Sequence, residues 1–139
     1  MADAVASQTI LDGERLFIAK FTNFSDGTGE TGVVKIDVSA LSSYQGNACT
    51  SVAIQTLDAI TVGLGLTLLW DATTDVVCLT LGENDFVSFN FARFGGLTNN
   101  AGAGKTGEIS FTTLDGSAGD TYTVVLEMQK HYVNPYSTL

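Results

Sequence analysis

Residues 66–81 read LTLLW-DATTD-VVCLTL, from Leu66 to Leu81, and they carry the clearest β-hairpin signal in the sequence. Both flanks are rich in β-branched, aromatic and leucine side chains, which suit a sheet. The five residues between the flanks are small or polar, as turns require, with an Asp at each end. This stretch predicts two antiparallel strands near the middle of the chain.

Similar strand signals recur on both sides of this hairpin, and no long stretch keeps an apolar stripe at helical spacing. In residues 121–130, for example, Tyr122, Val124 and Leu126 fall on one face while polar residues fall on the other. The predicted strands are 15–22, 33–38, 51–62, 66–70, 76–81, 86–91, 109–113 and 121–130. We therefore expect an all-β fold, an antiparallel β-sandwich or jelly roll of about eight strands.

Three details of this assignment concern particular segments. Strands 15–22 and 33–38 are expected to form a hairpin across a glycine-containing turn, with Val34, Ile36 and Val38 on its dry face. Residues 51–62 also fit a short helix, so both alternatives stay open there. Residues 39–47 are polar and small and predict a loop or a single helical turn.

The length of 139 residues predicts one domain, residues 1–139, with a short N-terminal arm (1–8) and a C-terminal arm (131–139). The formal net charge of -9 argues against a general grip on nucleic acid and against binding to an anionic membrane. No run is long and apolar enough for a membrane span, and the first residues lack signal-peptide character. Cys49 and Cys78 are expected to be free thiols.

Residues 95–107 resemble a phosphate-binding loop because they contain Gly104-Lys105-Thr106. Asn99 stands where the first glycine of that motif belongs, and the residues after Thr106 alternate like a strand instead of opening a helix. The segment is therefore interpreted as a glycine-rich loop between strands, and no cofactor is expected.

Every catalytic scheme lacks a member, because His131 is the single histidine and lies at the start of the C-terminal arm. No catalytic residue and no metal ligand set is expected. The oxygen donors Asp26, Thr28 and Glu30 alternate around two glycines and leave a calcium site open as an alternative. The alternative is that these acidic side chains stabilise the turn by accepting hydrogen bonds from backbone N–H groups.

Partner contacts are expected in loops and at the chain ends, which carry binding surfaces more often than core strands do. Phe24 and Phe94 lie beside loops and are the aromatic residues expected at the surface, whereas the aromatics at alternating strand positions are expected in the core. The expected contact residues are Asn99, Asn100, Lys105, Asp26, Glu30, Phe24, Phe94, Tyr132 and Tyr136.

Five segments carry a resemblance to a known class of proteins: KFTNFSDGTGE (20–30), KIDVSAL (35–41), LWDATTD (69–75), FGGLTNNAGAGKTG (94–107) and DTYTVVLE (120–127). In this order they resemble the small virion structural proteins of marine tailed bacteriophages, including those of cyanobacteria. The resemblance implies a capsid decoration (cement) protein, often a homotrimer, made in the host cytoplasm and placed on the outside of the head, with the major capsid protein as partner. It implies no catalytic residues.

Three other functions stay open on the sequence alone. The chain could be a tail or neck adaptor, or a carbohydrate-binding module that uses Trp70, Phe24 or Phe94 as a stacking platform. A nucleotide-binding enzyme built on Lys105 and Thr106 is the third alternative.

Overall fold

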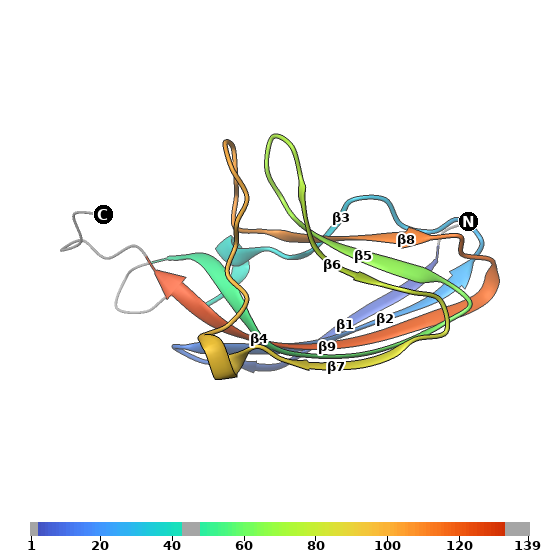
Figure 1. Ribbon diagram of the computed structural model, residues 1–139, viewed down its shortest axis with the longest axis horizontal. Coiled ribbons are helices and arrows are strands. Elements are labelled where there is room, and N and C mark those ends of the chain that lie inside the picture. Colours follow the sequence, from blue (N-terminus) through green and yellow to red (C-terminus); the bar gives the residue numbers. More distant parts are fainter. Residues whose placement is uncertain (1–2, 43–47, 133–139) are drawn as a thin grey trace.

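The computed structural model describes residues 3–42 and 48–132, and these form nine β-strands, two short 3₁₀ turns and no α-helix (Figure 1). The strands lie in two antiparallel sheets. Their bounds are β1 Ala4–Asp12, β2 Leu16–Asp26, β3 Val33–Ile36, β4 Cys49–Val62, β5 Gly65–Trp70, β6 Val76–Leu81, β7 Phe86–Asn90, β8 Ile109–Leu114 and β9 Ala118–Tyr132. The turns are η1 Val38–Ala40 and η2 Ala92–Phe94.

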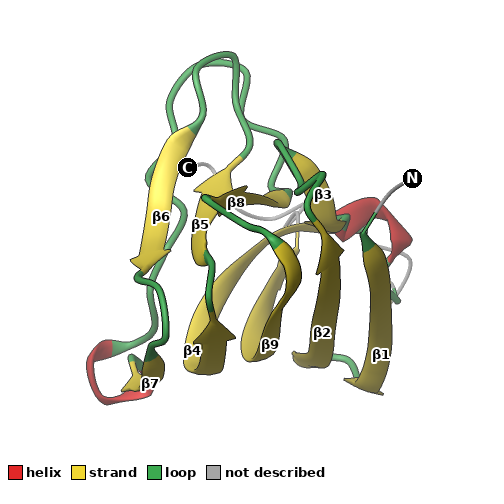
Figure 2. Cartoon of the chain, turned by 90° about the vertical axis from the view of Figure 1, so that its right-hand side faces the viewer, coloured by secondary structure: helices red, strands yellow, loops and turns green. Residues whose placement is uncertain are grey.

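The expected all-β sandwich is confirmed, and the strand order identifies it as a jelly roll. One sheet has the order β1-β2-β9-β4-β7 and the other the order β3-β8-β5-β6 (Figure 2). Strands pair in nested fashion, β5 with β6, β4 with β7, β3 with β8 and β2 with β9. A long hairpin rolled up on itself gives this nesting, which defines the eight-stranded jelly roll. Strand β1 is an addition at the β2 edge.

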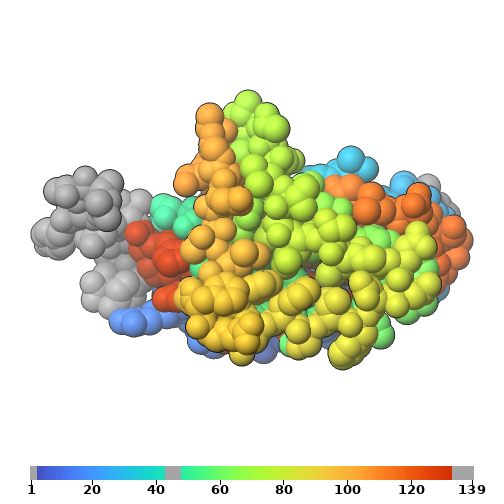
Figure 3. Space-filling view, viewed as in Figure 1, coloured from blue at the N-terminus to red at the C-terminus, as the bar shows by residue number. Residues whose placement is uncertain are grey.

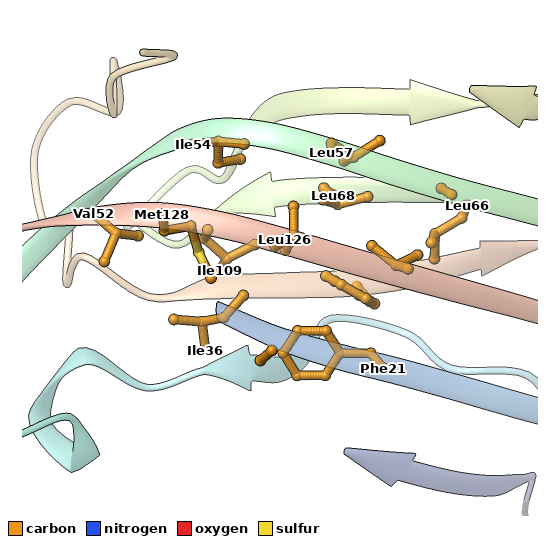
Figure 4. Close-up of a cluster of buried hydrophobic side chains, with 14 of the residues drawn as sticks. Phe21, Ile36, Val52, Ile54, Leu57, Leu66, Leu68, Ile109, Leu126 and Met128 are labelled. Carbon is orange, nitrogen blue, oxygen red and sulfur yellow. The ribbon is translucent and has the colours of Figure 1, made fainter. Parts of the chain in front are cut away.

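The core lies between the two sheets and is built from the inward side chains of alternating strand positions (Figure 4). Its largest fully buried side chains are Trp70, Tyr122 and Phe111. The Phe111 ring meets Phe21 edge-on at 5.5 Å and Tyr122 at 5.9 Å, so the aromatic residues tie both sheets together.

Three sequence expectations are confirmed. Strands β5 and β6 form the hairpin predicted from residues 66–81. In β9, Tyr122, Val124, Leu126 and Met128 are all buried, as the alternation requires. Residues 51–62 are strand and not helix, because β4 pairs with both β7 and β9.

The predicted hairpin between residues 15–22 and 33–38 is wrong. Strand β2 pairs with β1 and β9, whereas β3 pairs with β8 in the opposite sheet, so the turn after β2 crosses between sheets. The register of β3 shifts between Val34 and Ile36, and this bulge turns Val34 to solvent while Ile36 stays buried. The pairing depends on strands that are distant in the sequence, β9 for β2 and β8 for β3, and the residues of the turn do not specify them.

The expected N-terminal arm is corrected as well. Residues 4–8 belong to β1, whose backbone runs antiparallel to β2 from Ala4 opposite Phe24 to Asp12 opposite Phe17. Residues 4–11 of this strand are all exposed. Because neither face of the strand is buried, its sequence lacks the alternation of apolar and polar residues that predicts a strand. At the other end, residues 131 and 132 complete β9, and the rest of the expected C-terminal arm, with Tyr136, lies outside the described residues.

Within residues 3–42 and 48–132, no helix has the length and hydropathy that crossing a bilayer would need.

Candidate functional site

Two loops stand out together from the body of the molecule (Figure 3). They are the β5–β6 turn, residues 71–75, and the β7–β8 loop, residues 98–107, and we call them the loop pair. The backbone N–H of Thr73 donates to the carbonyl of Ala103 at 3.2 Å, and that of Thr106 donates to the carbonyl of Asp71 at 3.2 Å. The Thr106 hydroxyl also donates to Asp71 Oδ2 at 2.8 Å. The loops therefore hold each other in place.

The glycines of the loop pair allow this close packing. A Cβ on Gly104 would lie 2.0 Å from Thr73 Oγ1, and one on Gly107 would lie 2.1 Å from the carbonyl oxygen of Thr50. Both glycines have positive φ, 78° and 84°, a conformation that other residues rarely adopt. The glycines are thus explained by close contact with Thr73 of the other loop and with Thr50 of β4, and the segment leads into strand β8 instead of a helix.

The loop pair presents two of the expected contact residues to solvent. Asn100 and Lys105 are exposed. Asn99 is half-buried, with its Oδ1 accepting from the N–H of Ala101 at 2.9 Å and its Nδ2 lacking a partner among the described residues. A depression of about 530 Å³ at the base of the loops is lined by Lys105, Asn99 and several hydroxyl groups. Amide and ammonium donors in such a place suit carbonyl or carboxylate oxygens of a partner protein.

The turn after β2 has a different role from the one expected. Glu30 is buried, and its Oε1 accepts from Asn23 Nδ2 at 2.8 Å and from the Tyr122 hydroxyl at 2.6 Å, while Oε2 pairs with Lys35 at 2.5 Å. Glu30 is therefore a structural residue and is not available as a surface contact. Asp26 is half-buried and its Oδ1 accepts from the N–H of Thr28 at 3.0 Å.

Two carboxylates fasten the ends of β1. Asp3 accepts from Asn23 Nδ2 at 3.0 Å and from the backbone N–H groups of Asp26, at the end of β2, and of Gly29, in the turn that follows. Asp12 accepts from the buried Lys130 ammonium and from Ser42. Burial alone would raise the pKa of each carboxyl, but these hydrogen bonds outweigh it, so both pKa values fall below their usual range.

The carboxylates of these polar clusters are occupied by donors of the chain itself. The described residues contain no group of three His, Cys, Asp or Glu side chains placed to hold an ion. Of the proposed calcium donors, Glu30 is taken up by Asn23, Tyr122 and Lys35. Cys49 and Cys78 are free thiols, and burial raises the pKa of both.

The division of the aromatic residues into buried and exposed side chains differs in part from the expectation. Trp70 is 1% exposed and cannot serve as a stacking platform, whereas Phe24 and Phe94 are 59% and 62% exposed, as predicted. Phe86, expected in the core, is 76% exposed because it lies on the outer face of the edge strand β7. Tyr132 ends β9 half-buried, and its hydroxyl donates to the carbonyl of Glu14.

Phe94 belongs to an aromatic cluster at the end of β7. Phe89 stacks on Phe91 at 5.5 Å, and Phe91 meets Phe94 edge-on at 5.9 Å. A shallow hollow of about 380 Å³ lies here, lined also by Arg93 and Asn90. The sequence motif FNFARF, residues 89–94, could have revealed this cluster once the strand was known to lie at an edge.

No family model of known proteins matches the chain. A search of curated proteins also finds no match. The candidate surfaces therefore rest on the geometry of this chain.

Proposed function

We propose that this protein is a non-enzymatic virion structural protein, a capsid decoration protein that binds the outside of a tailed-phage head where major capsid proteins meet. The proposal starts from the resemblance of five segments to small virion proteins of marine tailed phages. The observation that carries it is the loop pair, a projection that is braced by its own hydrogen bonds and joined to the hydrophobic core through Ala101 and Ala72.

The loop pair suits contact with a protein surface. Asn100 and Lys105 are exposed in it among small residues, together with the acidic Asp75. The chain as a whole is acidic, with a net charge of -9. A decoration protein stabilises an assembled shell because it binds that state and not the free subunits, as any ligand stabilises the form it binds. Rigid loops keep the ordering cost of such binding low.

Electron microscopy of the virion that carries this protein tests the proposal. We expect hundreds of copies on the head surface, with the loop pair against the major capsid protein. About a dozen copies at a neck or tail would identify an adaptor and refute decoration. In a binding assay with undecorated heads, Lys105→Glu and Asn100→Asp are expected to weaken attachment. Glu83→Gln, an exposed change away from the loop pair, is the matched control.

A second candidate function is carbohydrate binding at the Phe89–Phe91–Phe94 cluster. Aromatic rings beside amide and guanidinium donors are suited to stacking and hydrogen bonding with sugars. Jelly rolls occur in lectins as well as in viral capsid proteins, so the fold is compatible with both functions. A glycan array probed with the protein and with Phe94→Ala distinguishes them, because lectin activity requires a signal that this substitution removes.

A further inference from the structure

The outer face of the five-stranded sheet, which points away from the core, carries an uncharged band across all its strands. Register places Ala4, Phe24, Thr121 and Val62 in one row of this face. The next row contains Ala6, Thr22, Thr123, Ile60 and Phe86. We call these nine residues the apolar band. Phe24, Ile60, Val62 and Phe86 are all exposed large hydrophobic side chains.

The size and charge of the apolar band indicate a protein contact. Its four large side chains expose on the order of 400 Å² of apolar area, taking roughly 200 Å² for a whole Phe and somewhat less for Ile and Val. The largest apolar patch on a typical soluble monomer has about this size, and it is often functional. Two copies of a chain with net charge -9 repel each other, and the uncharged residues of the apolar band form a part of the surface where they can approach.

The order of the strands makes this face complementary to itself. Strand β9 is central, with β2 and β4 on either side and β1 and β7 outside them (Figure 2). A two-fold axis that lies between two such faces and runs along β9 brings β2 of one copy over β4 of the other. The same rotation brings β1 over β7. Sheets packed in this way lie about 10 Å apart, with their strands within about 30° of each other.

The residues brought together by this rotation match in size and charge. In the first row, Phe24 lies over Val62 of the other copy. In the second row, the small Ala6 lies over the large Phe86. In the row beyond the apolar band, Lys20 and Asp58 each flank Val125 of β9, so Lys20 of one copy faces Asp58 of the other.

The charges of this third row favour the same arrangement. Lys20 makes no ion pair with the described residues, and the Asp58 carboxylate accepts only from the Ser88 hydroxyl, at 2.6 Å. Two intermolecular Lys20–Asp58 pairs would form around the two-fold axis. The remaining charged residue on this part of the face is Glu127 of β9, one row further along and close to the axis.

We propose that a second copy of this chain covers the apolar band, giving a two-fold dimer through the outer face of the five-stranded sheet. This inference does not depend on the proposed function, because it concerns the purified protein alone. It differs from the homotrimer that the resemblance implies, since a three-fold contact would join two different surfaces.

Charge exchange between variants tests the dimer. Light scattering of the purified protein is expected to give twice the 14.6 kDa of one chain. Lys20→Glu and Asp58→Lys each place like charges opposite one another, and each is expected to weaken its own dimer by more than about tenfold. An equimolar mixture of the two variants restores both opposite-charge pairs and is expected to form a mixed dimer. Association of the mixture no tighter than that of the separate variants would overturn the proposal.

Two further variants give a readout that does not depend on charge exchange. Phe86→Ser is expected to shift the protein to monomer, whereas Phe94→Ser, a change of another exposed phenylalanine outside the apolar band, leaves the mass unchanged. Glu127→Gln removes a like-charge contact near the axis and is expected to tighten the dimer. A monomeric wild-type protein at high concentration, or a trimer that Phe86→Ser leaves intact, would also overturn the proposal.

Discussion

The Tyr122 hydroxyl donates a hydrogen bond of 2.6 Å to Oε1 of Glu30, which joins two buried residues 92 positions apart. Glu30 is tied at the same time to Asn23 and Lys35. Removing the hydroxyl with Tyr122→Phe withdraws a donor from a buried carboxylate, which is expected to lower the free energy of unfolding by about 1.5–3 kcal/mol. Urea unfolding at neutral pH measures this change.

Tyr132→Phe is the matched control for that prediction. Its hydroxyl donates to the carbonyl of Glu14 at the exposed end of β9, where water can replace the bond. We expect a loss of less than about 1 kcal/mol. Equal losses for the two variants would contradict the role assigned to the Glu30 cluster. Burial and the Glu30 hydrogen bond raise the pKa of Tyr122, so stability should fall only when the pH rises past the ordinary tyrosine value of 10.0.

Acid is expected to release strand β1. Hydrogen bonds hold the pKa of Asp3 and of Asp12 below 3.8, so their contribution to stability is complete above that pH and is lost as the pH falls through the folded-state values. Hydrogen exchange should show residues 4–12 opening first on acidification. In Asp12→Asn, which leaves Lys130 without its ion-pair partner, stability is lower at neutral pH and changes less with acid. Unchanged protection of β1 in acid would rule this out.

Sequence reasoning succeeded where neighbouring residues decide the structure. The β5–β6 hairpin was predictable because its strands are joined by five turn residues. It failed for β1, because none of the side chains from Ala4 to Leu11 is buried and the strand leaves no alternation to detect. It also failed for the partner of β2, since the glycines of the following turn permit a reversal without specifying which sheet receives β3.

The same holds for the candidate site residues: those decided by their neighbours in the sequence could be predicted, and those decided by distant strands could not. Exposure of Asn100 and Lys105 could be predicted because a glycine-rich loop has little to bury. The inward direction of Glu30 could not, since its partner Tyr122 lies on another strand. The position of Phe86 on the outer face depends on which side of β7 the opposite sheet covers, and only the complete topology determines that.

The close packing of the loop pair on Thr50 of β4 predicts a sharp contrast between two glycines. Gly107→Ala places a Cβ 2.1 Å from a backbone oxygen at a positive φ, so we expect the free energy of unfolding to fall by at least about 2 kcal/mol. Gly102→Ala meets nothing within 4 Å and is expected to change stability by less than about 0.5 kcal/mol. Thermal unfolding of both variants measures the contrast, and similar melting temperatures would count against the close contact between Gly107 and Thr50.

Both cysteines are expected to resist modification in the folded protein. Burial raises the pKa of Cys78 to about 12 and also raises that of Cys49, so neither forms much thiolate at mildly alkaline pH. A chromogenic thiol reagent should therefore react slowly with the native protein and rapidly with both thiols in urea. Rapid reaction of one thiol before unfolding would show that its strand opens.

The central position of β9 has a consequence for how the molecule is made. This strand is the last one described, yet it lies between β2 and β4, two strands that come much earlier in the chain. Until the ribosome has released residues 118–132, β2 and β4 lack the strand that lies between them, and their apolar faces stay exposed to solvent. Such non-local pairing slows folding and exposes the nascent chain to aggregation. High-level synthesis at reduced temperature should therefore improve the soluble yield.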